Sequence, residues 1–171
     1  MANSKHLEIL RGGVEVWNQW WIDDPSERDY MMGVYVTMAD LTDADLSGMN
    51  LSGIDFAGTV LDGADLSDAD LTQGRFYKTS LWGAELARAD LRRAWFLKTS
   101  LRNVNLRQAD LRGASLEAVD LRGADLTAAD LRGASLSFVN LVGADLRGAD
   151  LDGATLQHVK WSPSRGGPID V

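Results

Sequence analysis

Leucine or phenylalanine occupies every fifth position along most of the chain, from Leu41 to Leu156, with no insertion. The position two residues earlier is small or β-branched in most units, and the position one residue earlier is usually Asp, Asn or Ser. A spacing of five fits neither the 3.6-residue period of an α-helix nor the two-residue period of a free strand. Each unit instead predicts a short extended step followed by a turn. Because one such unit cannot bury its apolar face alone, the units must stack, which predicts an all-β solenoid.

A second, longer period is superimposed on the first. The stretch FYKTSL begins at Phe76, and FLKTSL begins at Phe96, twenty residues later. We interpret twenty residues as one coil of four units in which like side chains stack, since strands pair ~4.8 Å apart and offset rings pack well at such spacings. At four units per coil, the centres from Leu41 to Trp161 make about six coils. The expected inward columns are Phe56, Phe76 and Phe96, and Thr59, Thr79 and Thr99.

The repeating unit, A-(D/N/S)-L-x-x over residues 39–161, resembles the defining motif of the pentapeptide-repeat family. The resemblance implies a right-handed quadrilateral β-helix with four units per coil. It also implies that the central residue and the residue two places before it point inward, while the other three point outward. The handedness and the square section come from the resemblance alone.

The first thirty residues form a separate region, which we interpret as a helical cap and an acidic linker. An amphipathic helix is expected with Ser4 as its N-cap, and Gly12 and Gly13 weaken it or break it into two pieces. Its apolar side chains are Leu7, Leu10, Val14, Trp17 and Trp21. We expect this helix to cover the first coil; the alternative is a helix that binds a partner.

The other end of the solenoid offers no second helix. Residues 31–161 are assigned to the β-helix and residues 162–171 to an irregular tail rich in Pro and Gly. The last coil must then be covered by this tail, by Trp161 or by another subunit. A homodimer through the C-terminal coil is therefore one expectation.

Catalysis has little support in the sequence. The chain has no Cys and only two His, His6 and His158, which lie far apart in the sequence. It contains no phosphate loop, dinucleotide fingerprint or zinc-ligand spacing, and a repeated Asp column on a convex rod offers no cleft. We expect neither enzymatic activity nor a cofactor. No apolar run approaches the roughly 20 residues that span a bilayer, and no signal peptide is evident, so a cytoplasmic protein is expected.

The charge is distributed unevenly along the chain, whose net charge is −8. Residues 1–91 hold 16 acidic and 6 basic residues, whereas residues 92–171 hold 9 acidic and 11 basic residues. The acidic half, together with the resemblance to quinolone-resistance members that mimic DNA on gyrase, makes DNA mimicry an alternative function. The net charge disfavours direct nucleic-acid binding. The columns of Asp and Arg at positions such as Asp110 and Arg112 are interpreted as structural.

Large outward side chains are concentrated in the stretch that contains the twenty-residue echo. In a twenty-residue coil, Arg75 would lie over Trp95 and Trp82 over Arg102, the geometry of a cation–π contact. Aromatic and Arg side chains on an otherwise small, polar surface are typical of a protein-binding hot spot; local surface packing explains them equally well. The candidate residues are Arg75, Tyr77, Lys78, Trp82, Trp95, Leu97, Lys98 and Arg102.

The sequence thus favours a non-catalytic scaffold that binds a protein partner. A DNA mimic that binds gyrase and a purely structural solenoid that self-associates are the two alternatives.

Overall fold

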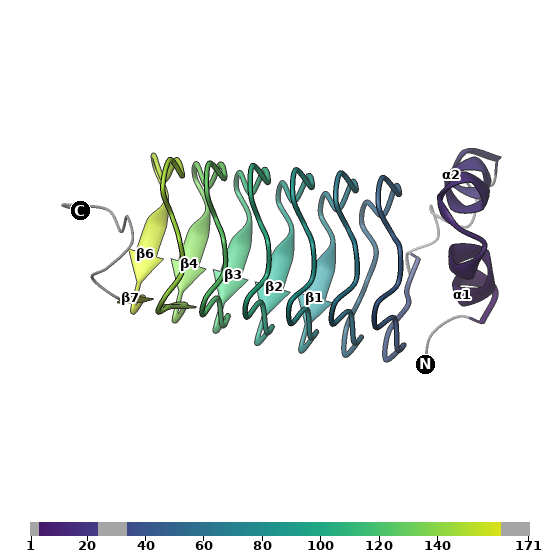
Figure 1. The fold of residues 1–171 in the computed structure, drawn as a ribbon, viewed down its shortest axis with the longest axis horizontal. Helices are drawn as coiled ribbons and strands as arrows, with labels where there is room; N and C mark the ends of the chain where they lie inside the picture. The colour runs from purple at the N-terminus through teal and green to yellow at the C-terminus, as the bar shows by residue number, and fades with distance from the viewer. Residues whose placement is uncertain (1–3, 24–33, 162–171) are drawn as a thin grey trace.

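The protein is a rod of stacked coils with two helices at its N-terminal end (Figure 1). The computed structural model describes residues 4–23 and 34–161. Backbone pairs are parallel and join residues twenty apart, as in the bridge between Asp45 and Asp65. One coil is therefore four five-residue units, and the fold is a right-handed quadrilateral β-helix. At twenty residues per coil, residues 34–161 make about six coils.

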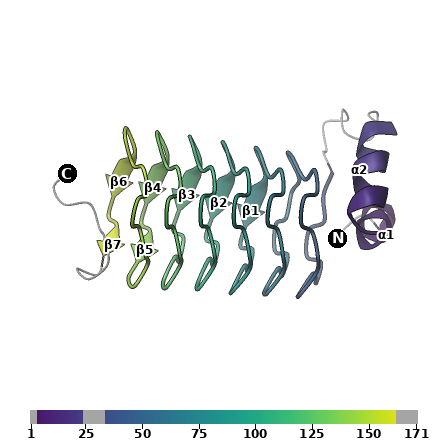
Figure 2. The ribbon, with the colours of Figure 1, turned by 45° about the horizontal axis from the view of Figure 1, so that its top comes forward.

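One side of the rod carries a continuous parallel sheet, and we call it the sheet face (Figure 2). Its strands are paired in the order β1-β2-β3-β4-β6, each with its partner twenty residues further along the chain. On the next side, two short strands form a separate pair, β5 with β7. The strands are β1 (Arg75–Tyr77), β2 (Trp95–Leu97), β3 (Ser115–Glu117), β4 (Ser135–Ser137), β5 (Asn140–Leu141), β6 (Thr155–Gln157) and β7 (Lys160–Trp161).

The centre of the rod is a stack of apolar side chains. Phe56, Phe76 and Phe96 are fully buried. Their rings lie parallel, with centroids 5.2 Å apart in the first pair and 4.6 Å apart in the second. The central leucines from Leu41 to Leu146 are buried in the same way, and each contributes about 1.5–3 kcal/mol to folding.

In the second inward column, the threonine hydroxyl groups are hydrogen-bonded to backbone carbonyls. Thr59, Thr79 and Thr99 are buried. Thr59 donates its hydroxyl proton to the carbonyl oxygen of Val36 at 2.8 Å, and Thr79 donates to that of Phe56 at 2.9 Å. Thr99 donates in the same way to the Phe76 carbonyl. A buried hydroxyl without an acceptor would destabilise the fold, so these bonds allow Thr to occupy a core column.

The last residue of each unit takes up a left-handed backbone conformation. From Met38 to His158, φ is positive at every such residue, for example +65° at Gly113 and +53° at Lys78. Gly reaches this region without steric penalty, which explains why Gly is common at this position of the repeat. Residues other than Gly also occupy this position, but the left-handed backbone conformation is energetically unfavourable for them.

The N-terminal cap consists of two helices, α1 (Ser4–Arg11) and α2 (Val14–Asp23). Leu10, Trp17 and Trp21 are buried against the end of the rod, and Leu7 is half-buried. Val14, also predicted for this apolar face, borders the space between the cap and the first coil, and its side chain is 39% exposed. The helix is interrupted after α1, where Gly13 has a φ of +89°. As a result, α2 does not continue the helical register of α1.

The cap also contains a buried histidine that the sequence did not single out. His6 is 2% exposed. Its ring lies 5.4 Å from that of Trp20 and 6.1 Å from that of Tyr35, so it joins α1 to both α2 and the first coil.

Side chains of α2 bind the exposed backbone edge of the first described coil. Asn50 accepts a hydrogen bond on its carbonyl oxygen from Trp17 Nε1 at 2.6 Å, and donates its N–H to Asn18 Oδ1 at 2.8 Å. On the opposite side of this strand, Leu51 donates its N–H to the Asp70 carbonyl of the next coil. Unpaired strand edges can pair with other chains. The side chains of α2 prevent this by occupying the backbone hydrogen-bonding groups at this edge.

The predicted acidic linker after Pro25, the expected start of the β-helix at Met31 and the tail over 162–171 lie outside the described residues. Within the two described segments, no helix has the length and apolarity needed to cross a membrane.

Candidate protein-binding surface

Strands β1 and β2 bring four of the predicted site residues together on the sheet face. In their register, Arg75 is paired with Trp95 and Tyr77 with Leu97. Since side chains alternate along a strand, burial of the central Phe in each strand forces its two neighbours outward. Lys78 and Lys98 follow the two strands at the left-handed positions and are exposed. We call these six residues the aromatic-basic patch: Arg75, Tyr77, Lys78, Trp95, Leu97 and Lys98.

The other two predicted residues lie on an adjacent side of the rod. Trp82 and Arg102 follow the inward residues Leu81 and Leu101, one unit beyond the patch. The Trp82 side chain is 53% exposed, and its backbone N–H donates to Asp62 Oδ1 at 2.9 Å. The eight candidates therefore divide between two sides instead of forming one surface.

The predicted cation–π pairs are not formed. Among the described residues, neither Arg75 with Trp95 nor Trp82 with Arg102 makes such a contact. Arg102 instead lies 3.9 Å from a carboxylate oxygen of Asp120 in the next coil. The cation–π contact of the patch joins Lys78 Nζ to the ring of Tyr77, at 5.2 Å from the centroid. Contacts of this kind at exposed sites contribute about 0.5–1 kcal/mol.

A shallow groove of about 460 Å³ runs through the patch. The small side chain of Ala57 lies in the same column as Tyr77 and Leu97, and leaves space that the larger residues border. Trp95 is 38% exposed at its rim. The groove is lined by Asp55, Ala57, Arg75, Tyr77, Trp95 and Leu97.

The cations of the patch lack carboxylate partners, unlike most others on the rod. Between residues 34 and 161, the arginines that form an ion pair are Arg88, Arg92, Arg102, Arg107, Arg112, Arg122, Arg132 and Arg147. The basic side chains of that segment without one are Arg75, Lys78, Arg93, Lys98 and Lys160. Three of these five belong to the patch, and Arg93 lies in the turn that leads into β2.

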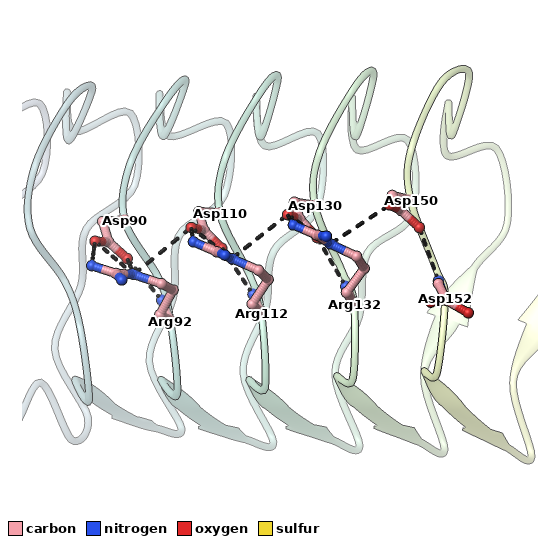
Figure 3. A network of polar contacts seen from close by, with 8 residues as sticks. All are labelled: Asp90, Arg92, Asp110, Arg112, Asp130, Arg132, Asp150 and Asp152. Atoms are coloured by element: carbon pink, nitrogen blue, oxygen red, sulfur yellow. Dashed lines mark hydrogen bonds and ion pairs between the residues drawn. The ribbon is translucent and has the colours of Figure 1, made fainter.

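Another side of the rod carries a ladder of alternating charge (Figure 3). In one step, Arg112 Nη2 lies 2.6 Å from Asp110 of its own coil, and Arg112 Nε lies 3.6 Å from Asp130 of the next. The hydrogen bond from Arg132 lowers the pKa of Asp130 below its ordinary value. The carboxylate is therefore ionised at neutral pH, and its oxygens accept hydrogen bonds from the Arg132 backbone N–H and guanidinium group. The ladder joins neighbouring coils, and each exposed pair contributes about 0.2–1 kcal/mol.

The described residues contain no cluster of three or more His, Asp or Glu that could hold a metal ion.

The C-terminal end of the rod is less covered than the N-terminal end. Leu151 and Leu156 of the last coil are half-buried, whereas the equivalent leucines of earlier coils are buried. In the preceding coil, Leu131 donates its N–H to the Asp150 carbonyl at 2.7 Å. The equivalent N–H of Leu151 has no acceptor among the residues that the structure describes.

Comparison with known proteins agrees with this geometry. The family model described as pentapeptide repeats (8 copies) matches four overlapping segments, residues 39–76, 75–108, 99–137 and 129–160. The chain belongs to the pentapeptide-repeat family. A comparison with curated proteins found no match.

Solved pentapeptide-repeat structures resemble this one to different degrees. A protein from the thylakoid lumen of Arabidopsis thaliana is 36% identical with a TM-score of 0.53, over 54% of this chain and 65% of that chain. The match thus spans less than two thirds of that relative. HetL of Nostoc, involved in heterocyst differentiation regulation, is 26% identical over 94% of both chains, with a TM-score of 0.43. QnrB1, a fluoroquinolone resistance protein, is 17% identical over 75% of this chain and 90% of that chain, with a TM-score of 0.38.

Proposed function

We propose that this pentapeptide-repeat protein is a non-catalytic scaffold that binds a protein partner through the aromatic-basic patch. One observation supports the proposal above others: exposed Trp95 and three cations without carboxylate partners lie together on one side of the rod. Trp, Tyr and Arg are the residue types enriched at the energetic centres of protein interfaces.

The rigidity of the sheet face favours a binding role. The backbone beneath the patch is held by the stacked rings of Phe76 and Phe96 and by the pairing of β1 with β2. Strand residues of this kind do not need to be ordered when a partner binds. A preformed surface reduces the entropic cost of association.

The proposal is tested by affinity capture from a native lysate, followed by reconstitution with the purified partner. We expect a protein that wild type and Val142→Ala retain equally, and that Trp95→Ala binds about tenfold or more weakly. Val142 is also exposed but lies outside the patch, so it controls for general loss of apolar surface. A partner that Trp95→Ala retains at wild-type affinity would contradict the assignment of the patch.

Self-association is a second candidate, and the C-terminal end favours it. The half-buried leucines lie beside the N–H of Leu151, which has no acceptor among the described residues, and such an edge can pair with another chain. Light scattering is expected to give twice the mass of one chain. A single-chain mass at high micromolar concentration would reject it.

A further inference from the structure

We propose that the aromatic-basic patch recognises a short acidic segment of its protein partner, in which one apolar side chain lies between acidic residues. This inference rests on the proposed function and adds the chemistry of the partner.

The first argument is charge. Lys78 and Lys98 lie at the end of each strand, and Arg75 lies at the start of β1, and none of the three has a carboxylate partner within the described segments. The outward positions of these two strands and their turns hold no acidic residue, although the whole chain has a net charge of −8. Elsewhere on the rod most arginines are neutralised by a neighbouring Asp. A cationic surface that the protein does not neutralise itself is complementary to an anionic ligand.

The second argument is shape. The groove lies between Arg75 on one edge of the strands and the two lysines that follow the other edge, and its apolar lining comes from Ala57, Tyr77 and Leu97 with Trp95. Its volume of about 460 Å³ accommodates one large apolar side chain. The cations on the two edges then meet acidic residues on either side of that side chain. At about 3.3 Å per extended residue, a segment of roughly five to seven residues crosses the sheet face.

The third argument is the limited extent of the cationic surface. Asp55 is paired with Arg75 at one end of the patch, and Glu117 is paired with Leu97 at the other. The uncompensated charge is therefore confined to two coils, about 5 Å apart. A nucleic-acid strand carries a phosphate on every residue and would place some of them over these carboxylates. A short acidic peptide approaches only one of them, Asp55, which lines the groove.

The first experiment selects ligands without assuming a sequence. A library of randomised seven-residue peptides displayed on phage is enriched on the full chain, with a Lys78→Gln/Lys98→Gln variant as the comparison. We expect the peptides enriched on wild type to carry two or more Asp or Glu around one apolar residue, and to be lost from the variant. Enriched peptides without excess Asp and Glu, or equal recovery on the variant, would overturn the proposal.

The second experiment measures one synthesised winning peptide by fluorescence anisotropy. Each single Lys→Gln change is expected to weaken binding about 2- to 5-fold, and Trp95→Ala about tenfold or more. Asp55→Asn is expected to tighten binding about 2- to 5-fold, because it removes a repulsive charge from the groove. Its Oδ1 acceptor for the Ala57 N–H, at 2.9 Å in the wild type, is retained in Asn.

The matched control is Asp65→Asn. Asp65 accepts the same type of turn hydrogen bond, from the Ser67 N–H at 2.9 Å, but lies on another side of the rod. It changes the net charge by the same amount and should leave the affinity unchanged. Equal tightening by both variants would show a general charge effect and reject recognition at the groove.

A thymidine oligonucleotide is used as a competitor, to distinguish a nucleic acid from an acidic peptide as the ligand. Displacement of the peptide by micromolar oligonucleotide would overturn the choice of an acidic peptide. These experiments also distinguish a failure of this inference from a failure of the proposed function. A partner lost with Trp95→Ala but without a preference for acidic peptides leaves the scaffold proposal standing and rejects this inference.

Discussion

Replacing Leu111 with Asp is expected to abolish the cooperative thermal unfolding of the rod. Leu111 is 1% exposed and occupies the centre of its unit near the middle of the solenoid. An ionised carboxylate there has no partner, and its desolvation costs several kcal/mol, a large part of the roughly 5–15 kcal/mol that stabilises an ordinary domain. Because each coil contacts only its neighbours, disruption of this coil also separates the two halves of the stack. The measurement is the circular dichroism signal as a function of temperature.

Two variants control this experiment. Leu111→Met keeps the volume of the side chain and should destabilise by less than about 1.5 kcal/mol. Arg112→Gln changes the adjacent outward residue and should remain within about 1 kcal/mol of wild type. A thermal midpoint of Leu111→Asp equal to that of wild type would mean that the inward register is wrong.

Replacing Trp17 with Ala is expected to lower the free energy of unfolding by about 3–5 kcal/mol. The Trp17 side chain is fully buried between the cap and the rod, and its Nε1 group donates to the Asn50 carbonyl. Its loss leaves a cavity and an unbonded backbone carbonyl at the end of the solenoid. We also expect soluble aggregates in light scattering, because the strand edge that α2 closes becomes accessible.

Guanidinium unfolding measures the first effect, with Val16→Ala as the control on the same helix. Val16 is 51% exposed, so its truncation should change stability by no more than about 0.5 kcal/mol. Equal unfolding midpoints for the two variants would show that the cap does not stabilise the rod.

The repeat made most of the fold predictable from the sequence. The five-residue spacing identified the inward positions, and the echo at Phe76 and Phe96 identified the length of the coil, because a buried ring is best accommodated above another ring. The handedness could not be obtained in this way, since a spacing along the chain is the same for either hand. The resemblance to a family supplied it.

The cap was predicted less completely than the rod, because a helical pattern does not show how far each side chain is covered. Val14 shares the face of Trp17, three residues later, but it begins α2 and remains 39% exposed. His6 was missed for a related reason: a polar residue beside Leu7 gives no sign that Trp20 and Tyr35 will enclose it.

The sequence located the region of the candidate site but did not predict how its side chains are arranged. The twenty-residue coil correctly implies that Arg75 and Trp95 are neighbours in register. It does not say which way a long side chain turns when two partners compete, and Arg102 lies toward Asp120 instead of Trp82. The split of the eight residues between two sides follows from the corner between Lys78 and Trp82, which a linear list of outward positions does not show.

The twenty-residue coil has a consequence for how binding surfaces are oriented about the axis of the rod. An insertion of five residues after the patch would preserve the hydrophobic pattern, yet it would rotate everything that follows by a quarter turn. Only an insertion of twenty would lengthen the rod without rotating it. The patch at Trp95 and the last strand of the sheet face, β6 at Thr155, are three coils apart. Two partners bound at these places would therefore be held roughly 15 Å apart along the axis and in a fixed angular relation. The pentapeptide determines whether the chain folds, and the number of pentapeptides determines the direction in which each surface faces.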